Sequence, residues 1–269
     1  MKNKLTPANY LWLILGGIFF IFPLLAAVEF SLRKAGNKGY DFSNYSWFLQ
    51  EDGFTTNLRV SIELAVLTAI LVLILMVPTV VYTHLGGKRY RRLVEFLCLV
   101  PLVVPVVCYA IGAVTFLPAL FQTPFYDFGW GLDGLPWGLA FLYVVVSLPY
   151  TYRALDVGLS SVALETLVEA SKSSGASFGQ TLRYVVVPSI KSAVNGALFM
   201  AVALSLGEFT LAVLMHFDTF PTWIANFSQD NVLGSIALSV FSLVGALIIV
   251  LIVSIIPNLK KKPALQEQE

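Results

Sequence analysis

The chain has 269 residues, of which 57% are apolar and only 12% are charged, and its formal net charge at pH 7 is +1. A soluble domain usually has about 45–50% apolar and about 25% charged residues, so this chain lacks the polar surface that a water-soluble globule needs. The composition therefore excludes an ordinary soluble protein and predicts an integral membrane protein.

Six apolar stretches have about the 20-residue length that a membrane-spanning helix requires. They are Tyr10–Phe30, Ser61–Tyr82, Leu93–Phe116, Trp137–Tyr152, Val194–Met215 and Ser235–Ile256. We therefore expect an all-α membrane protein with six transmembrane helices, forming a single domain over residues 1–269 with its core at 58–256. Lys2 and Lys4 precede the first stretch as in a signal peptide. That stretch is too long for one and has no A-x-A-type cleavage site, so we expect it to be retained as a helix.

The basic residues between these stretches indicate which side of the membrane each loop occupies. Of the 17 Lys and Arg residues, 13 lie before the first stretch, between the second and third, between the fourth and fifth, or after the sixth. They are Lys2, Lys4, Lys88, Arg89, Arg91, Arg92, Arg153, Lys172, Arg183, Lys191 and Lys260–Lys262. The loops 117–136 and 216–234 carry only acidic charges, at Asp127, Asp133, Asp218 and Asp230. Both termini are therefore expected in the cytoplasm.

The first outer loop departs from this pattern, because it holds Arg33, Lys34, Lys38 and Arg59. Three acidic residues offset these charges: Asp41, Glu51 and Asp52. Within the loop, Tyr45–Leu49 is aromatic enough to lie along the membrane surface. We interpret it as part of an interfacial aromatic belt rather than as a ligand site.

Two prolines lie four residues apart in the third stretch and therefore share one face of a helix. Pro101 and Pro105 remove two backbone donors in mid-membrane, which bends a helix and leaves carbonyl groups for other helices or water to satisfy. A kinked pore-lining helix and a kink that only packs against neighbours both fit this pattern. Cys98 and Cys108 lie in the same run without CxxC spacing, so neither a disulfide framework nor a metal site is expected.

The cytoplasmic loop 153–191 is long and patterned. Thr166–Glu169 and Ser177–Gln180 each fit a capping box, in which a hydroxyl caps a helix start and the residue three positions later reaches back. Gly175 lies between them and can adopt the positive φ that ends one helix and turns the chain. Pro188 then interrupts the second helix before the next span. An ordinary helical hairpin and an element that docks onto another protein both fit these local rules.

Glu208 lies in the fifth stretch, which is otherwise apolar. An acidic side chain at depth in a membrane costs roughly 2.5–3.5 kcal/mol on insertion scales and usually faces a bundle interior or a wet cavity. Glu208 either lines or gates a path, or it is interfacial or paired structurally with another helix.

The sequence lacks the motifs of the obvious enzymes. It has no G-x-x-x-x-G-K-[ST] phosphate loop, and the nearest match, Gly86–Lys88, lacks the first glycine and the following Ser or Thr. The two histidines, His84 and His216, fall on opposite sides of the predicted membrane, which excludes a zinc-protease pattern. We therefore expect no ATP hydrolysis by this chain and no cofactor bound to it.

Three groups of residues follow one another in this loop: Glu169-Ala170-Ser171, then Gly175, then Val185–Pro188. Their order resembles the EAA---G---------I-LP signature of permease subunits in bacterial ABC importers. Ser171 replaces the second alanine, and two valines replace Ile and Leu, which are mild departures. Leu148–Arg153 and Pro101–Pro105 also resemble this family. Ser205–Phe209 is similar to members that serve molybdate, sulfate, ferric iron and polyamines. The resemblance covers essentially the whole chain.

The resemblance implies a type I ABC importer permease in the bacterial cytoplasmic (inner) membrane, working by alternating access. Its implied partners are ATPase subunits that bind ATP and Mg, a second homologous or identical permease subunit, an extracytoplasmic substrate-binding protein and the lipid bilayer, with no nucleic acid. The implied coupling helix comprises Glu169, Ala170, Ser171, Gly175, Ala176, Ser177, Phe178 and Pro188. The implied translocation path includes Glu208, Phe209, Pro101 and Pro105. The expected cargo is a polyamine such as spermidine or putrescine, and the alternatives are ferric iron, molybdate or sulfate, phosphonate and thiamine.

Two other classes of membrane protein fit the sequence less well. An ion-coupled secondary transporter would show internal repeats and discontinuous helices around a midplane site, and no convincing repeat relates the two halves of the sequence. A membrane-embedded enzyme would need His, Asp or Glu clustered at catalytic spacing, which the sequence does not show. Neither class predicts the pattern from Thr166 to Pro188.

Overall fold

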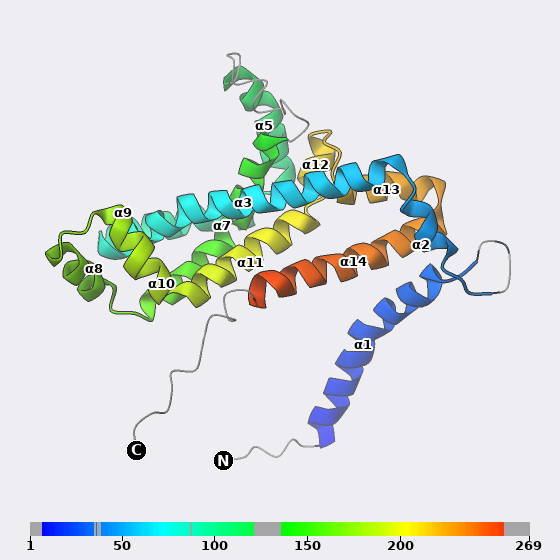
Figure 1. Cartoon of the computed structure of the whole chain (residues 1–269), viewed down its shortest axis with the longest axis horizontal. Coiled ribbons are helices and arrows are strands. Elements are labelled where there is room, and N and C mark those ends of the chain that lie inside the picture. The colour runs from blue at the N-terminus through cyan, green and yellow to red at the C-terminus, as the bar shows by residue number, and fades with distance from the viewer. Residues whose placement is uncertain (1–6, 35, 37–38, 87, 121–135, 256–269) are drawn as a thin grey trace. The chain divides into compact units, whose positions relative to one another are not determined.

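The structure is a computed structural model, and it describes residues 7–34, 36, 39–86, 88–120 and 136–255 (Figure 1). Within these ranges the regular structure is helical, apart from one isolated antiparallel bridge between Arg33 and Tyr40. The all-α prediction is therefore confirmed for the part of the chain described. Several charges used to predict the topology lie outside the described residues, namely Lys2, Lys4, Lys38, Asp127, Asp133 and Lys260–Lys262.

The longer helices are α1 (Pro7–Ser31), α3 (Asp52–Leu85), α4 (Lys88–Val103), α5 (Val106–Leu120), α7 (Trp137–Ser160), α11 (Lys191–Gly207), α13 (Phe220–Asp230) and α14 (Val232–Ile255). The shorter ones are α2 (Ser43–Phe48), α8 (Leu164–Ser173), α9 (Phe178–Thr181), the π-helix η1 (Leu182–Val186), α10 (Val187–Ser189) and α12 (Thr210–Leu214). α3 begins before the predicted Ser61 and α7 continues past Tyr152, because a helix can extend beyond the apolar stretch that hydropathy detects.

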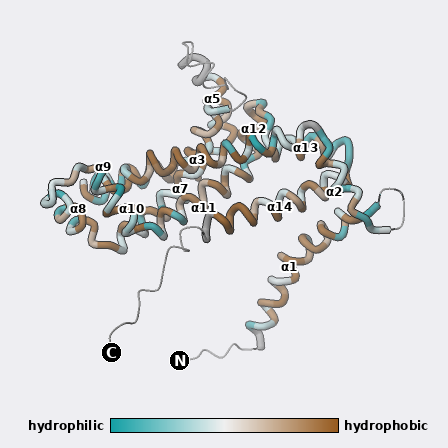
Figure 2. Tube along the Cα trace, viewed as in Figure 1, coloured by the Kyte–Doolittle hydropathy of each residue, from teal (hydrophilic) through white to brown (hydrophobic). Residues whose placement is uncertain are grey.

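Four helices are long and apolar enough to cross a membrane, over Asn9–Ser31, Gly53–Leu85, Trp137–Ser160 and Val232–Ile252. Two bent pairs pass the same test jointly, so the described residues allow up to six crossings. Figure 2 shows hydrophobic residues along most of α1, α3 and α14. These helices match a chain that lies in lipid, where a helix satisfies all its own backbone groups.

The third predicted span is broken into α4 and α5, which meet at 99°. The break falls at the two prolines: Pro101 lies inside α4, and Pro105 immediately precedes α5. Beside them the Val104 N–H donates to the Val100 carbonyl at 3.1 Å, and the Cys108 N–H donates to the Pro105 carbonyl at 2.9 Å. The predicted kink is confirmed, and it is a sharp corner because two neighbouring turns each lack a donor.

One compact unit comprises Asn57–Thr222 and Ala246–Glu269. In it α3, α7 and α11 lie side by side (Figure 1), and their facing side chains form an apolar core that includes Val72, Val80, Leu155 and Ala201. A second apolar cluster joins α3, α5, α7 and α12, and its members include Leu64, Ala113, Leu139, Tyr143 and Leu211. The first core also contains residues of α8 and η1, so the segment after α7 is built onto the helix bundle.

The other compact unit comprises Met1–Thr56 and Trp223–Gly245. Its α2 contains the segment that we expected to lie along the membrane surface. Instead, Phe48 is fully buried, with its ring centroid 5.4 Å from that of Phe54 and 5.5 Å from that of Phe241. Trp47 packs on Phe227 at 4.7 Å between centroids. Phe48 therefore packs inside the protein instead of facing outward as part of an aromatic belt, because aromatic rings from α2, α3, α13 and α14 contact one another.

The start of α2 is fixed by polar contacts. The Asn44 side-chain amide donates to the Ser31 and Arg33 carbonyls, both at 2.9 Å, which ties α2 to the end of α1. Asp41 Oδ1 accepts hydrogen bonds from the Ser43 hydroxyl at 2.5 Å and the Ser43 N–H at 3.0 Å. These hydrogen bonds to Ser43 hold the pKa of the Asp41 carboxyl below its usual value.

A close contact between α7 and α11 generates a prediction about stability. A Cβ added at Gly158 of α7 would lie 2.1 Å from the Ala193 Cβ of α11, whereas one added at Gly196 of α11 would lie 3.9 Å from the Ala154 Cβ. Gly158→Ala forces two helix backbones apart and should lower the free energy of unfolding by about 1–3 kcal/mol. Gly196→Ala, the matched control, should leave it unchanged or raise it by up to about 1 kcal/mol through helix propensity. The unfolding midpoints of the two variants in detergent measure both changes in stability. Equal shifts of the two midpoints would contradict the close contact between Gly158 and Ala193.

Candidate functional site

The site singled out in the sequence is a helical hairpin that follows α7. Within the segment 153–191, α7 continues to Ser160, and the hairpin consists of α8, a turn, α9, η1 and α10. One side of α8 is held to the bundle, because Leu164 and Val168 are buried in the apolar core. Its other side, with Glu169 and Ala170, is exposed. The hairpin therefore has an anchored face and a presented face.

The turn after α8 is a glycine-dependent helix ending. Gly175 has φ +79°, in the left-handed region that favours glycine. Its N–H donates to the Lys172 carbonyl at 2.9 Å, and the Ala176 N–H donates to the Ser171 carbonyl at 3.2 Å. These two bonds form a Schellman motif, which satisfies the last carbonyls of a helix. The predicted conformation of Gly175 is confirmed.

The second helix of the hairpin begins with the predicted capping box. The Ser177 N–H donates to Gln180 Oε1 at 2.8 Å, and the Gln180 N–H donates to the Ser177 hydroxyl at 3.4 Å. Such a cap stabilises a helix start by typically about 1 kcal/mol. The turn between Gly175 and Ser177 is thus fixed on both sides.

The other predicted capping box, at Thr166–Glu169, is wrong. α8 begins at Leu164 after Ala163, and no side chain caps it. Thr166 lies inside the first turn, so its hydroxyl cannot take the N-cap position. The buried Leu164 determines the start, because tertiary packing overrides a four-residue pattern that is common by chance.

Ser171, one of the departures from the signature that the sequence resembles, joins the two arms of the hairpin. Its hydroxyl lies 2.8 Å from that of Thr181, which is 1% exposed. The Thr181 hydroxyl also donates to the Ser177 carbonyl at 3.0 Å, and it has a single proton, so Ser171 is the donor between the two hydroxyls. This contact joins α8 to α9 through two hydroxyl groups.

The exit from the hairpin is a π-helix followed by a corner. η1 ends immediately before Val187 and Pro188, and the helical segment Phe178–Ser189 meets α11 at 89°. Pro188 offers no N–H to the helix ladder, which accounts for the irregular turns around it. Two aromatic side chains of this arm are exposed: Phe178 by 45% and Tyr184 by 67%.

The predicted path residues lie at two helix breaks. The fifth span is not continuous, because Glu208 has extended backbone between α11 and α12. Its Oε1 accepts a hydrogen bond from the Leu211 N–H at 2.9 Å, which satisfies a donor at the start of α12. Phe209 is 41% exposed. Leu211 of α12 packs in the same apolar cluster as Val106 of α5, so the structure brings this break close to the proline corner.

A mainly apolar groove of about 680 Å³ lies among α4, α7 and α11. Among the described residues that line it are Glu95, Arg153 and Met200. Glu208, Phe209, Pro101 and Pro105 are not in that lining. The two helix breaks and the groove are therefore separate features of the bundle.

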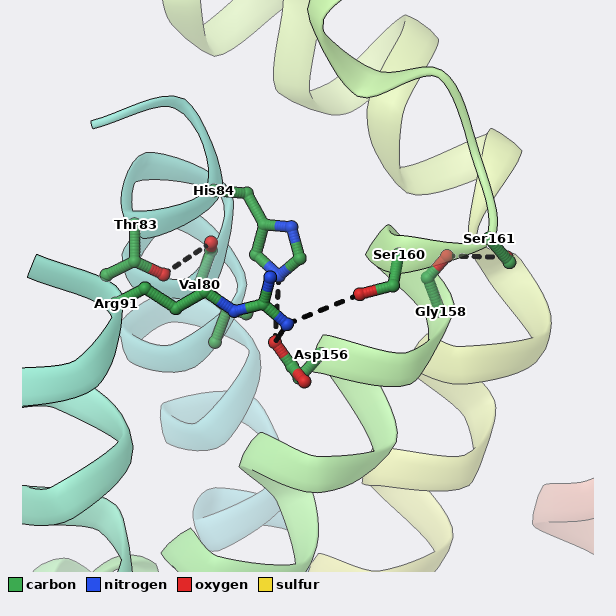
Figure 3. A network of polar contacts seen from close by, with 8 residues as sticks. All are labelled: Val80, Thr83, His84, Arg91, Asp156, Gly158, Ser160 and Ser161. Atoms are coloured by element: carbon green, nitrogen blue, oxygen red, sulfur yellow. Dashed lines mark hydrogen bonds and ion pairs between the residues drawn. The ribbon is translucent and has the colours of Figure 1, made fainter. Parts of the chain in front are cut away.

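One polar cluster was not singled out in the sequence. Asp156 of α7 is 5% exposed, and its Oδ1 lies 2.8 Å from Arg91 Nη2 and 2.9 Å from His84 Nε2 (Figure 3). The same Arg91 nitrogen lies 3.4 Å from the Ser160 hydroxyl. A lone acidic residue in an apolar helix signals a partner, and this signal was applied to Glu208 but not to Asp156.

Comparison with known proteins gives a family and two structural relatives. Residues 66–262 match the model of the family described as binding-protein-dependent transport system inner membrane component. The fold resembles a bacterial ABC transporter involved in the import of the acidic polysaccharide alginate, with a TM-score of 0.64 and 17% identity over 95% of both chains. It also resembles a bacterial alginate ABC transporter in complex with an alginate pentasaccharide-bound periplasmic protein, with a TM-score of 0.63 and 18% identity over 95% of this chain and 94% of that one.

The two capping patterns provide a matched pair of variants. Ser177→Ala removes an observed cap and should lower the opening free energy of the segment 175–190 by about 1 kcal/mol. Thr166→Ala removes a hydroxyl that caps nothing and should leave that value unchanged. Hydrogen exchange followed by mass spectrometry on the detergent-solubilised protein measures both. A larger effect at Thr166 than at Ser177 would show that the hairpin starts have been assigned wrongly.

Proposed function

The chain belongs to the family of inner membrane components of binding-protein-dependent transport systems, and from this premise we propose that it is the permease subunit of an ATP-driven importer. In this proposal it forms half of a substrate path and does not hydrolyse ATP itself. ATP and Mg are bound by separate ATPase subunits, a second permease subunit supplies the other half, and an extracytoplasmic binding protein delivers the cargo. In the same proposal, both termini are cytoplasmic and the chain crosses the cytoplasmic membrane of a bacterium six times.

The hairpin carries this proposal. A motor subunit can drive a membrane protein only through an element that does not deform when it is pushed. The hairpin meets that need, because the Schellman turn at Gly175, the cap at Ser177 and the Ser171–Thr181 contact fix its shape. Its anchored residues, such as Val168 and Val186, share one apolar core with α3, α7 and α11. Displacement of the hairpin therefore reaches the spanning helices directly.

The presented face of the hairpin suits a protein partner. Phe178 and Tyr184 are exposed aromatic side chains, and such residues commonly anchor interfaces. Glu169, Ala170 and the turn at Gly175 lie on the same exposed hairpin. We assign this face to a cleft of the ATPase subunit.

The substrate path is proposed at the helix breaks and the neighbouring groove. A break exposes backbone and polar side chains that a continuous helix would hide, and such positions commonly bind cargo in transporters. Glu208, Phe209, Pro101 and Pro105 are therefore our candidates for residues that move or line the path. The groove among α4, α7 and α11 is our candidate for the face that the second permease subunit closes.

The proposed cargo is a polyamine, with ferric iron, molybdate or sulfate, phosphonate and thiamine as alternatives. The proposal rests on the Ser205–Phe209 segment and on the acidic character of the predicted outer loops, including Asp218 and Asp230. The two solved relatives concern alginate, an acidic polysaccharide. Thermal shifts of the cognate binding protein with spermidine, putrescine, each alternative and alginate oligosaccharide decide among them. A shift with an anion alone would overturn the polyamine assignment.

Replacing the exposed Phe178 of the hairpin by alanine should weaken binding of the ATPase subunit. Phe178→Ala removes an exposed ring that the partner would bury, and loss of such an anchor typically costs about 2 kcal/mol or more, which raises Kd roughly 30-fold. Phe42→Ala removes a ring that is 72% exposed in the loop before α2, on the predicted opposite side of the membrane, and should have no effect. Co-purification and titration of the tagged ATPase measure both. Equal affinity of the Phe178 variant and the unaltered chain would remove this residue from the interface.

Two substitutions in the hairpin should separate ATP hydrolysis from transport. Gly175→Asp adds a charged side chain at φ +79° on the presented turn, and Glu169→Ala removes the exposed carboxylate of the signature. Both proteins should insert normally, retain ATPase activity in the complex and lose most transport into proteoliposomes. Gly175→Asn is the control, since asparagine tolerates this backbone conformation and adds no charge. Normal transport by both test variants would refute the coupling role.

A further inference from the structure

The cluster around Asp156 joins three helices through one carboxylate. Arg91 belongs to the first turns of α4, His84 to the last turn of α3, and Asp156 to α7 (Figure 3). The side chains of His84 and Asp156 are only 9% and 8% exposed, whereas that of Arg91 is 39% exposed. The corner between α3 and α4 is therefore attached to α7 by charge-assisted contacts rather than by surface pairing.

A buried ion pair is a poor way to gain stability, because desolvation of the charges offsets much of their attraction. Replacing a whole buried pair by well-packed apolar residues is often neutral or even stabilising. What an ion pair supplies is geometry: the guanidinium and the imidazole each contact the same oxygen at a defined distance. The cluster therefore specifies how α7 sits against the α3–α4 corner.

The position of the cluster connects it to the hairpin. Asp156 lies one helical turn before Ser160, where α7 ends and the hairpin begins, and Arg91 also approaches the Ser160 hydroxyl. A cavity of about 460 Å³ is lined by His84 and Arg91 on one side and by Leu164–Thr166 of α8 on the other. The start of α8 therefore does not pack tightly against the α3–α4 corner. Next to this cavity, the contacts of Asp156 with His84 and Arg91 connect the corner to the end of α7.

We propose that Asp156 is a positioning residue that locks the root of the hairpin to the α3–α4 corner, so that the hairpin, α7 and this corner move as one body during the transport cycle. The inference rests on the proposed function, because it assumes that a partner pushes the hairpin. His84 and Arg91 act through Asp156. Without the carboxylate, a push on the hairpin is absorbed by rotation at the end of α7 and does not reach α4.

Distance measurements between two spin labels test this directly. One label is attached at Ser173→Cys on α8 and the other at Tyr90→Cys on α4, both at exposed positions. The exposed Cys108 is first replaced by serine, while the buried Cys98 can stay. The labelled chain is purified with its co-expressed ATPase and placed in nanodiscs of phosphatidylethanolamine and phosphatidylglycerol. The distance between the two labels is then measured by double electron–electron resonance, without and with ATP and Mg.

In the otherwise unaltered chain we expect one narrow distance distribution whose mean does not change on addition of ATP and Mg. In Asp156→Asn the distribution should broaden by about twofold or more and its mean should shift with ATP, because the neutral amide no longer holds the guanidinium. Arg91→Gln should behave in the same way, and Arg91→Lys, which keeps the positive charge, should restore part of the narrow distribution. Arg89→Gln is the matched control, since Arg89 is exposed two residues earlier on α4.

A variant that leaves a buried charge unpaired can fail to fold, so the neutral double variant Arg91→Gln with Asp156→Asn gives a second reading. It removes both charges and should fold, yet it should still show the broad distribution. A narrow, ATP-insensitive distribution in Asp156→Asn or in the double variant, with the ATPase still bound, overturns the positioning role and leaves the proposed function standing. Failure of the unaltered chain to retain any ATPase overturns the proposed function instead, and this inference with it.

Discussion

Inside a bilayer no water is available to the backbone, so each N–H and C=O group must find its partner within the protein. This constraint decides where the chain can depart from a straight helix. At the proline corner, the N–H groups of Val104 and Cys108 still reach carbonyls beside the break. At the second break, the Glu208 carboxylate satisfies the Leu211 N–H. Beside the two breaks, Val106 and Leu211 pack into one apolar cluster of α3, α5, α7 and α12.

The hairpin also satisfies the backbone groups at its helix ends internally, although it lies outside the apolar stretches, and this makes it stiff. The end of α8 is closed by the turn at Gly175, and the start of α9 by Ser177 and Gln180. A water-exposed hairpin could leave these groups to solvent at little cost. Satisfying them internally removes the alternative conformations that solvation would permit. The buried Val168 and Val186 then connect the stiff element to the helix bundle.

The sequence was sufficient for features that local rules determine. Apolar length predicted the four helices that are long and apolar enough to cross a membrane, but not the break of the fifth stretch at Glu208. Two prolines predicted the kink at Pro105, and glycine and serine predicted the turn at Gly175 and the cap at Ser177. It was insufficient where tertiary packing decides. The start of α8 depends on the burial of Leu164, which no four-residue pattern contains, and the burial of Phe48 depends on aromatic residues far along the chain. The partners of Asp156 are equally distant in sequence, so periodicity could not reveal them.

Glu208 and Asp156 are two acidic residues in apolar surroundings, and they differ in where their partners come from. Glu208 accepts a hydrogen bond from a backbone group three residues away, so its carboxylate shapes only the local break. Asp156 is held by side chains from two other helices. A local contact keeps its geometry whichever way the helices move, whereas a contact between helices must either move them together or break. Of the two residues, only Asp156 therefore links α7, at the root of the hairpin, to the side chains of α3 and α4.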